Sequence, residues 1–107
     1  MNKEKIIKES KRYTEIISKK NSYKNKYYSI YIDKSDKTQY GITVPKKIGK
    51  AHIRNRLKRQ VKNIIMNNEK NIQNNYCYVI IIKEAILDLD YHEMENELLT
   101  LLKKVRN

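Results

Sequence analysis

Hydrophobic residues recur along the chain with two periods, and the longer period predicts helices. In residues 10–19, Tyr13, Ile16 and Ile17 lie at i, i+3 and i+4 behind a serine that can cap a helix. After Gly49 the same spacing extends over a longer segment. Its expected core residues are Ile53, Leu57, Val61, Ile64 and Ile65.

The shorter period, two, predicts strands. Residues 27–33 alternate, with Tyr28, Ile30 and Ile32 on one face and Tyr27, Ser29 and Tyr31 on the other. A second alternating segment contains Tyr40, Ile42 and Val44, and it ends at Pro45, which lacks a backbone donor. We expect these two strands to pair as a hairpin, because only a short polar turn separates them. The run Tyr76–Ile82 is apolar on both faces, which favours a central strand.

The last helix is expected to begin at a capping box formed by Asp90 and Glu93. Its expected core residues are Tyr91, Met94, Leu98, Leu101, Leu102 and Val105. The element order is then α-β-β-α-β-α. No linker, repeat or low-complexity tract divides the 107 residues, so we expect an α+β fold in which residues 1–107 form a single domain.

Charge is distributed unevenly over this pattern. The chain has 24 Lys and Arg against 12 Asp and Glu, and residues 37–68 contain nine of those cations and no acid. Lysine is far commoner than arginine, yet three of the five arginines, Arg54, Arg56 and Arg59, fall within six residues. Arginine presents a planar, forked donor that suits phosphate or base edges. The segment therefore indicates a polyanionic partner, although a solvated helix face and chance clustering remain alternatives.

The cations also lie on one side of the predicted long helix. Projected at about 100° per residue, the apolar positions occupy one arc and the polar positions the other. The polar arc contains Arg54, Asn55, Arg56, Lys58, Arg59 and Lys62. One side of this helix should therefore pack against the protein, and the other should present positive charge.

The chain offers little chemistry of its own. Cys77 is the single cysteine and lies in an apolar run, so we expect a buried thiol, no disulfide and a reducing, cytoplasmic compartment. His52 and His92 are expected at the surface. The acidic residues of 88–97 fit a solvated helix start better than a metal site. We expect no catalytic residue, no bound metal and no membrane-spanning segment.

Tyrosines supply a second candidate surface. Tyr27 and Tyr31 are predicted on the strand face opposite the core positions, and Tyr13 of the first helix could lie beside them. Exposed aromatic rings flanked by cations form a stacking platform for unpaired bases. Periodicity alone leaves open whether these rings stack on bases or pack beneath the first helix.

Residues 46–59, with Lys46-Lys47-Ile48-Gly49 followed by Arg54-Asn55-Arg56-Leu57-Lys58-Arg59, resemble the signature of the bacterial ribonuclease P protein component. The resemblance implies an α/β sandwich with a left-handed βαβ crossover, similar to domains of ribosomal protein S5 and elongation factor G. Generic topology rules would predict the right-handed form.

In that family the protein joins a catalytic RNA, and the holoenzyme removes the 5′ leader of precursor tRNA in a magnesium-dependent hydrolysis. The RNA supplies the active site and uses the magnesium, so the resemblance implies no cofactor bound by the chain alone. The implied partners are the ribonuclease P RNA and the single-stranded leader, which lies in a cleft between the sheet and the first helix. Neither a membrane nor DNA is expected as a partner.

Carried over by position, the resemblance assigns functional residues to two surfaces. The surface for the catalytic RNA comprises Lys46, Lys47, Lys50, Arg54, Asn55, Arg56, Lys58, Arg59 and Lys62. The surface for the leader comprises Tyr13, Ile17 and Tyr31, to which strand alternation adds Tyr27. Ile17, Lys62 and Pro45 depart from the family pattern, and Ile17, which replaces an aromatic residue, implies weaker stacking.

Three other functions are compatible with a small basic domain. A ribosomal or other structural RNA-binding protein is the main alternative, because charge, size and fold are shared with such proteins. A nuclease that acts without RNA would need a catalytic pair that the sequence lacks. A duplex DNA reader could insert a basic helix into the major groove.

Overall fold

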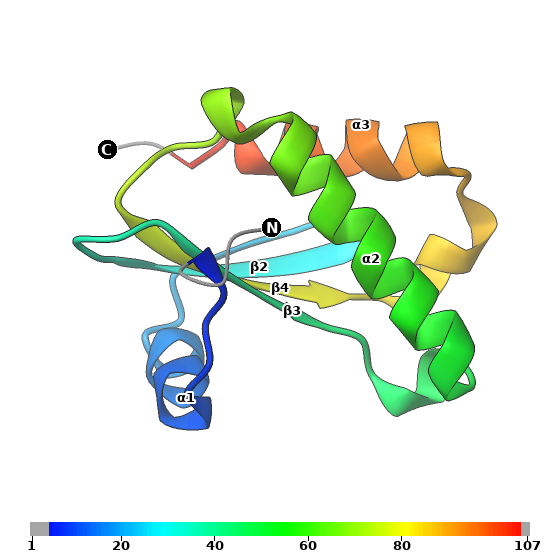
Figure 1. Ribbon diagram of the computed structural model, residues 1–107, viewed down its shortest axis with the longest axis horizontal. Coiled ribbons are helices and arrows are strands. Elements are labelled where there is room, and N and C mark those ends of the chain that lie inside the picture. Colours follow the sequence, from blue (N-terminus) through cyan, green and yellow to red (C-terminus); the bar gives the residue numbers. More distant parts are fainter. Residues whose placement is uncertain (1–4, 106–107) are drawn as a thin grey trace.

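A four-stranded sheet separates the helices into two layers (Figure 1). The structure is a computed structural model that describes residues 5–105. The strands are β1 (Ser22–Lys24), β2 (Tyr28–Lys34), β3 (Gln39–Thr43) and β4 (Tyr76–Ile82). They lie in the order β1-β2-β4-β3; β4 pairs antiparallel with β2 and parallel with β3. The chain passes from β3 to β4 through a helix, which is the parallel crossover that such pairing requires.

The predicted hairpin between β2 and β3 is wrong, because β4 lies between them. Ile80 of β4 is opposite Ile30 of β2 on one side and Ile42 of β3 on the other. The central position suits β4, whose residues are buried on both faces except for the half-buried Ile81. The four residues 35–38 easily span two strand spacings of about 4.8 Å each, so a short connection did not require direct pairing. The three-residue β1 was also not predicted.

Two helices cover one face of the sheet, α2 (Ala51–Asn67) and α3 (Tyr91–Leu102), seen above the sheet in Figure 1. The predicted core positions of α2 are confirmed: four of them are buried and Ile53 is half-buried against the same cluster. In α3 the predicted capping box is present, with the backbone N–H of Glu93 donating to Asp90 over 2.8 Å and that of Asp90 donating to Glu93 over 3.0 Å. This layer buries Tyr28, Ile30, Ile32, Tyr40, Ile42, Tyr78, Ile80 and Ile82 of the sheet.

The first helix, α1 (Ser10–Ser18), covers the opposite face. Its Ile16 is fully buried and clusters with Ile7, Cys77 and Val79, so the expected buried thiol is confirmed. The predicted capping role of Ser10 is wrong. Ser10 is already inside the helix, and the preceding residue makes no side-chain capping bond.

Short 3₁₀ turns connect the larger elements: η2 (Lys46–Ile48), η3 (Glu69–Asn71) and η4 (Glu84–Asp88). The segment before α1 borders the outer edge of β3, where the backbone N–H of Ile7 donates to the carbonyl of Tyr40 over 3.0 Å. Within residues 5–105, no helix has the length and apolar character needed to span a membrane.

Candidate RNA interface

The outer side of α2 presents the polar arc predicted from its period, and we call these six residues the basic face. Asn55, Arg56, Lys58 and Arg59 are exposed, whereas Arg54 and Lys62 are half-buried at its margins. The helix positions them because Leu57, Val61, Ile64 and Ile65 fix its opposite side in the core. The members of the basic face are Arg54, Asn55, Arg56, Lys58, Arg59 and Lys62.

The cations of the basic face have no acidic partner among residues 5–105. The ion pairs formed among residues 5–105 join Lys5 to Glu69, and Arg12 and Lys19 to acids near α1; none includes a residue of α2. Adjacent positive charges repel one another, so an external polyanion would stabilise this surface. Phosphate groups are the natural ligands for such clustered guanidinium and ammonium groups.

Arg54 has a local role as well. Its Nε donates to the carbonyl of Gly49 over 3.1 Å, which ties the side chain to the turn that precedes α2. The backbone N–H of Arg54 donates to Lys50, over 3.1 Å, within the first helical turn. The Nε bond orients the guanidinium plane at the start of the helix.

The lysines of the approach to α2 extend the positive surface. Lys46, Lys47 and Lys50 are exposed, and η2, which contains the first two, is anchored by the buried Ile48. The structure also gives Pro45 a role that its departure from the family pattern left unexplained. Its φ of −59° precedes η2, and its carbonyl accepts the backbone N–H of Ile48 over 3.1 Å.

Tyr13, Ile17 and Tyr31 lie on the α1 side of the sheet, and we call these three residues the tyrosine patch. The ring of Tyr13 lies against Gly41 of β3, where a Cβ would overlap the phenol. Partial burial raises the pKa of Tyr13 above its usual value. Ile17 follows one turn later on the same side of α1 and is 37% exposed. Tyr31 is half-buried beside the small cluster around Val79, and the Lys24 ammonium lies 5.5 Å from its ring centroid.

Tyr27 does not join the tyrosine patch, so its predicted placement on the same face as Tyr31 is wrong. It precedes β2 and packs against the larger core, on the side of α2 and α3. Asn25 explains the change: its side-chain oxygen accepts the backbone N–H groups of Tyr27 and Tyr28, each over 2.8 Å. This turn interrupts the alternation before the strand begins.

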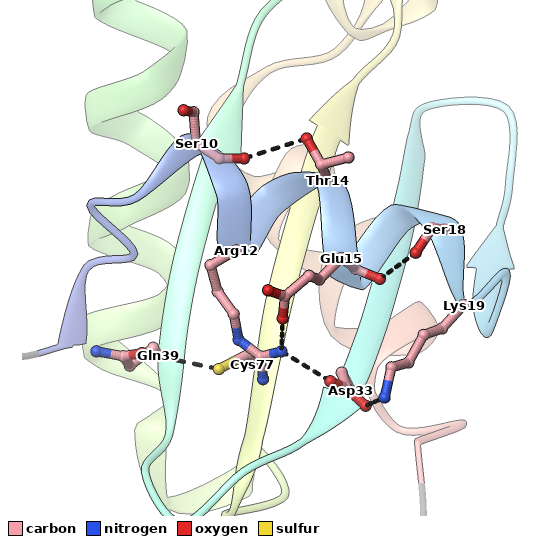
Figure 2. A network of polar contacts seen from close by, with 9 residues as sticks. All are labelled: Ser10, Arg12, Thr14, Glu15, Ser18, Lys19, Asp33, Gln39 and Cys77. Atoms are coloured by element: carbon pink, nitrogen blue, oxygen red, sulfur yellow. Dashed lines mark hydrogen bonds and ion pairs between the residues drawn. The ribbon is translucent and has the colours of Figure 1, made fainter.

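A network of ion pairs holds α1 to β2 (Figure 2). Asp33 accepts Arg12 over 2.9 Å on one oxygen and lies 3.3 Å from Lys19 on the other. Arg12 also lies 3.3 Å from Glu15. Burial opposes ionisation of Asp33, but hydrogen bonds from Arg12 and Lys19 outweigh it and lower the pKa of the carboxyl group. No local pattern predicts the two pairs to Asp33, because Arg12 and Lys19 lie more than ten residues before it.

Other chemical groups stay apart. His52 and His92 are both exposed, as expected. Within the described residues, no three His, Cys, Asp or Glu side chains are grouped so that they could hold a metal ion. A hollow beside α1 does not include the tyrosine patch; it is lined by Ile6, Ile7, Lys8, Glu9, Arg12, Lys37 and Gln39.

Comparison with known proteins supports the family resemblance of residues 46–59. Residues 1–106 match the Ribonuclease P family. The chain is 33% identical to the ribonuclease P protein component of Mycoplasma mycoides, covering 99% of this chain and all of that protein. It is 35% identical to the corresponding protein of Clostridium botulinum, covering 95% of each.

Solved structures agree in fold. The RNase P protein of Thermotoga maritima superposes with a TM-score of 0.88 at 27% identity, covering 94% of this chain and 97% of that one. A Staphylococcus aureus RNase P protein mutant superposes with a TM-score of 0.89 at 27% identity, covering 95% of this chain and 88% of that one. A ribosomal or purely structural RNA-binding role is therefore not favoured. The chain belongs to the Ribonuclease P family: it is the protein partner of the ribonuclease P RNA, in a holoenzyme whose RNA catalyses tRNA 5′ leader processing.

Proposed function

We propose that the chain, acting over residues 1–107 as a single RNA-binding domain, uses two surfaces in this holoenzyme. The basic face of α2, with Lys46, Lys47 and Lys50, binds the catalytic RNA. The tyrosine patch binds the single-stranded leader of precursor tRNA. The observation that supports this division is that α2 exposes Arg56, Lys58 and Arg59, which form no ion pair within residues 5–105. These cations lie on the opposite side of the sheet from Tyr13 and Tyr31.

Binding of the catalytic RNA follows from charge. Each phosphate that a lysine or arginine neutralises releases condensed counterions, so affinity falls steeply as salt rises. Arg56 and Arg59 add forked donors that two phosphate oxygens can accept, whereas Lys58 and Lys62 act as point charges. The departure at Lys62 therefore retains the charge and loses only the bidentate geometry.

Leader binding follows from the aromatic rings. Unpaired bases stack on tyrosine rings with about 1–3 kcal/mol per base. Only the precursor has a leader, so stacking on the tyrosine patch favours substrate over product and lets mature tRNA leave. Ile17 offers apolar contact without a π face, and it reduces this preference relative to an aromatic residue.

Magnesium in this scheme is used by the catalytic RNA. Assembly of the catalytic RNA with its substrate brings phosphates close together, and divalent cations offset their repulsion. A protein that neutralises part of the RNA charge lowers the magnesium concentration needed for the folded complex. We place the complex in the reducing cytoplasm, which suits the free, buried thiol of Cys77.

Reconstitution tests both surfaces. The purified chain is added to ribonuclease P RNA at low magnesium, and RNA affinity, leader removal and binding of precursor and mature tRNA are measured. Lys58→Ala should reduce the slope of log affinity against log salt for the catalytic RNA by about 0.7–0.9, the value of one phosphate contact. Lys103→Ala, which removes an exposed lysine outside the basic face, should leave it unchanged.

Tyr31→Ala tests the second surface in the same assay. It should weaken binding of precursor tRNA by about fivefold or more and leave mature tRNA binding as it was, because only stacking with the leader is lost. An equal loss for both RNAs would contradict the leader assignment. An unchanged salt slope for Lys58→Ala would contradict the assignment of the basic face.

A further inference from the structure

Lys24 of β1 occupies a defined position over the ring of Tyr31. Its ammonium lies 5.5 Å from the ring centroid. The pairing of β1 with β2 fixes this arrangement: Ser22 is opposite Tyr31 and Lys24 is opposite Ser29. Lys24 and Tyr31 are therefore diagonal neighbours on one face of the sheet, a separation that a long side chain spans.

The contact with Tyr31 is weak enough to be exchanged. Lys24 is exposed, and the ion pairs within residues 5–105 do not include it. An exposed cation–π contact contributes about 0.5–1 kcal/mol, less than or equal to the stacking of one base on the same ring. A lysine ammonium on its flexible stem can turn from the ring to a phosphate oxygen a few ångströms away.

We propose that Lys24 is a phosphate-binding residue for the leader. In the free protein it covers the face of Tyr31. When an unpaired base stacks on that ring, the ammonium moves to the adjoining phosphodiester, so one residue exchanges its aromatic partner for an anionic one. The inference rests on the leader-binding role of Tyr31 proposed above, and it adds β1 to the surface that the leader contacts.

The chain contains a matched comparison. Lys26 lies 5.9 Å from the ring centroid of Tyr27, which is the same kind of contact. Tyr27, however, packs against the larger core on the side of α2 and α3. Lys26 is exposed like Lys24, so substitution of either lysine removes one charge and one cation–π contact. Only Lys24 is next to the tyrosine patch.

The test compares Lys24→Met and Lys26→Met in the reconstituted holoenzyme. Affinities for precursor tRNA with a single-stranded leader and for mature tRNA are measured over a salt series. Lys24→Met should reduce the salt slope for the precursor by about 0.7, the value of one single-strand phosphate contact. It should weaken precursor binding at low salt about three- to tenfold and leave mature tRNA unchanged. Lys24→Arg should retain the slope, and Lys26→Met should match the unsubstituted protein.

Three results would overturn the inference: an unchanged slope for Lys24→Met, an equal reduction for Lys26→Met, or tighter precursor binding by Lys24→Met. The last would mean that Lys24 only competes with the leader for the ring. Tyr31→Ala separates this failure from that of the proposed function. If Tyr31→Ala lowers the preference for precursor while Lys24→Met does not, only the role of Lys24 is lost. If neither variant changes that preference, the leader-binding role itself is wrong.

Discussion

The basic face and the tyrosine patch are built in opposite ways. All six residues of the basic face come from one helix, α2, so their relative positions follow from helical geometry once the apolar side is docked. The tyrosine patch combines α1 with β2 and depends on β3, because Tyr13 fits only against a residue without a side chain. The surface proposed for the catalytic RNA is therefore encoded locally, within one helix. The surface proposed for the leader exists only in the complete fold.

Substitutions in the two surfaces should consequently have different effects. Replacing Arg56, Lys58 or Arg59 of the basic face should remove a proposed contact with RNA and little else, since these side chains are exposed. Disturbing the tyrosine patch can act at a distance, through the glycine under Tyr13 or through the ion pairs that hold α1.

The largest expected effect comes from the basic face. Arg56→Ala combined with Arg59→Ala should weaken binding of the catalytic RNA at least about a hundredfold at low salt, because each lost charge-assisted contact contributes about 1.5–3 kcal/mol. The salt slope should fall by about 1.4–1.8, twice the value for one phosphate. Thermal unfolding should stay unchanged. A loss confined to precursor tRNA would show that these arginines contact the leader.

A smaller, more selective effect is expected from Gly41→Val. A Cβ at Gly41 overlaps the far end of the Tyr13 side chain, which can swing away at modest cost to the fold. The ring then leaves the patch, so precursor binding should weaken about tenfold, within the range of one lost stacking contact. Affinity for the catalytic RNA should not change. Gly49→Ala is the control for a substituted glycine outside the tyrosine patch. Its Cβ would meet Ile53 of α2 at 3.2 Å and not Tyr13, so the preference for precursor over mature tRNA should stay unchanged.

The contrast between the surfaces also explains what could be predicted from the sequence. The period of α2, the span Tyr76–Ile82 and the Asp90 capping box all depend on neighbouring residues, and the structure has them as predicted. The motif in residues 46–59 also predicted the family, and the comparisons confirm that prediction.

The errors lie where distant segments meet or where one turn shifts a pattern. Strand pairing was wrong because β4, far along the chain, inserts between β2 and β3. Tyr27 was placed on the wrong face because the Asn25 turn ends the alternation before β2. The Arg12–Asp33 pair was missed because its partners lie on α1 and β2, and no local pattern links them.

Loss of the Arg12–Asp33 ion pair should reduce the stability of the fold. Asp33→Asn should lower the free energy of unfolding near neutral pH by about 1–2 kcal/mol, between the values for exposed and buried pairs. The pKa of Asp33 is lowered in the folded protein, so its contribution is complete above the ordinary value of 3.8 and is lost as the pH falls through the lowered pKa. Denaturant melts from neutral to acidic pH should therefore converge for the two proteins at low pH. Asp88 is exposed, and the ion pairs within residues 5–105 do not include it, so Asp88→Asn should follow the unsubstituted protein. A constant gap for Asp33→Asn would show that the charge does not matter.

The smallest expected effect is an increase in affinity for precursor tRNA. Ile17 is 37% exposed on the same side of α1 as Tyr13, where an aromatic residue would present a ring to the leader. Ile17→Phe should strengthen precursor binding about fivefold, because a partly exposed ring contributes the lower end of the 1–3 kcal/mol range for stacking. Mature tRNA, which has no leader, should bind as before. Leu87→Phe enlarges another exposed hydrophobic residue, 48% exposed in η4, and it should leave both affinities unchanged. If Ile17→Phe strengthened binding of precursor and mature tRNA equally, the cause would be added apolar area and not stacking with the leader. The tyrosine patch would then comprise only Tyr13 and Tyr31.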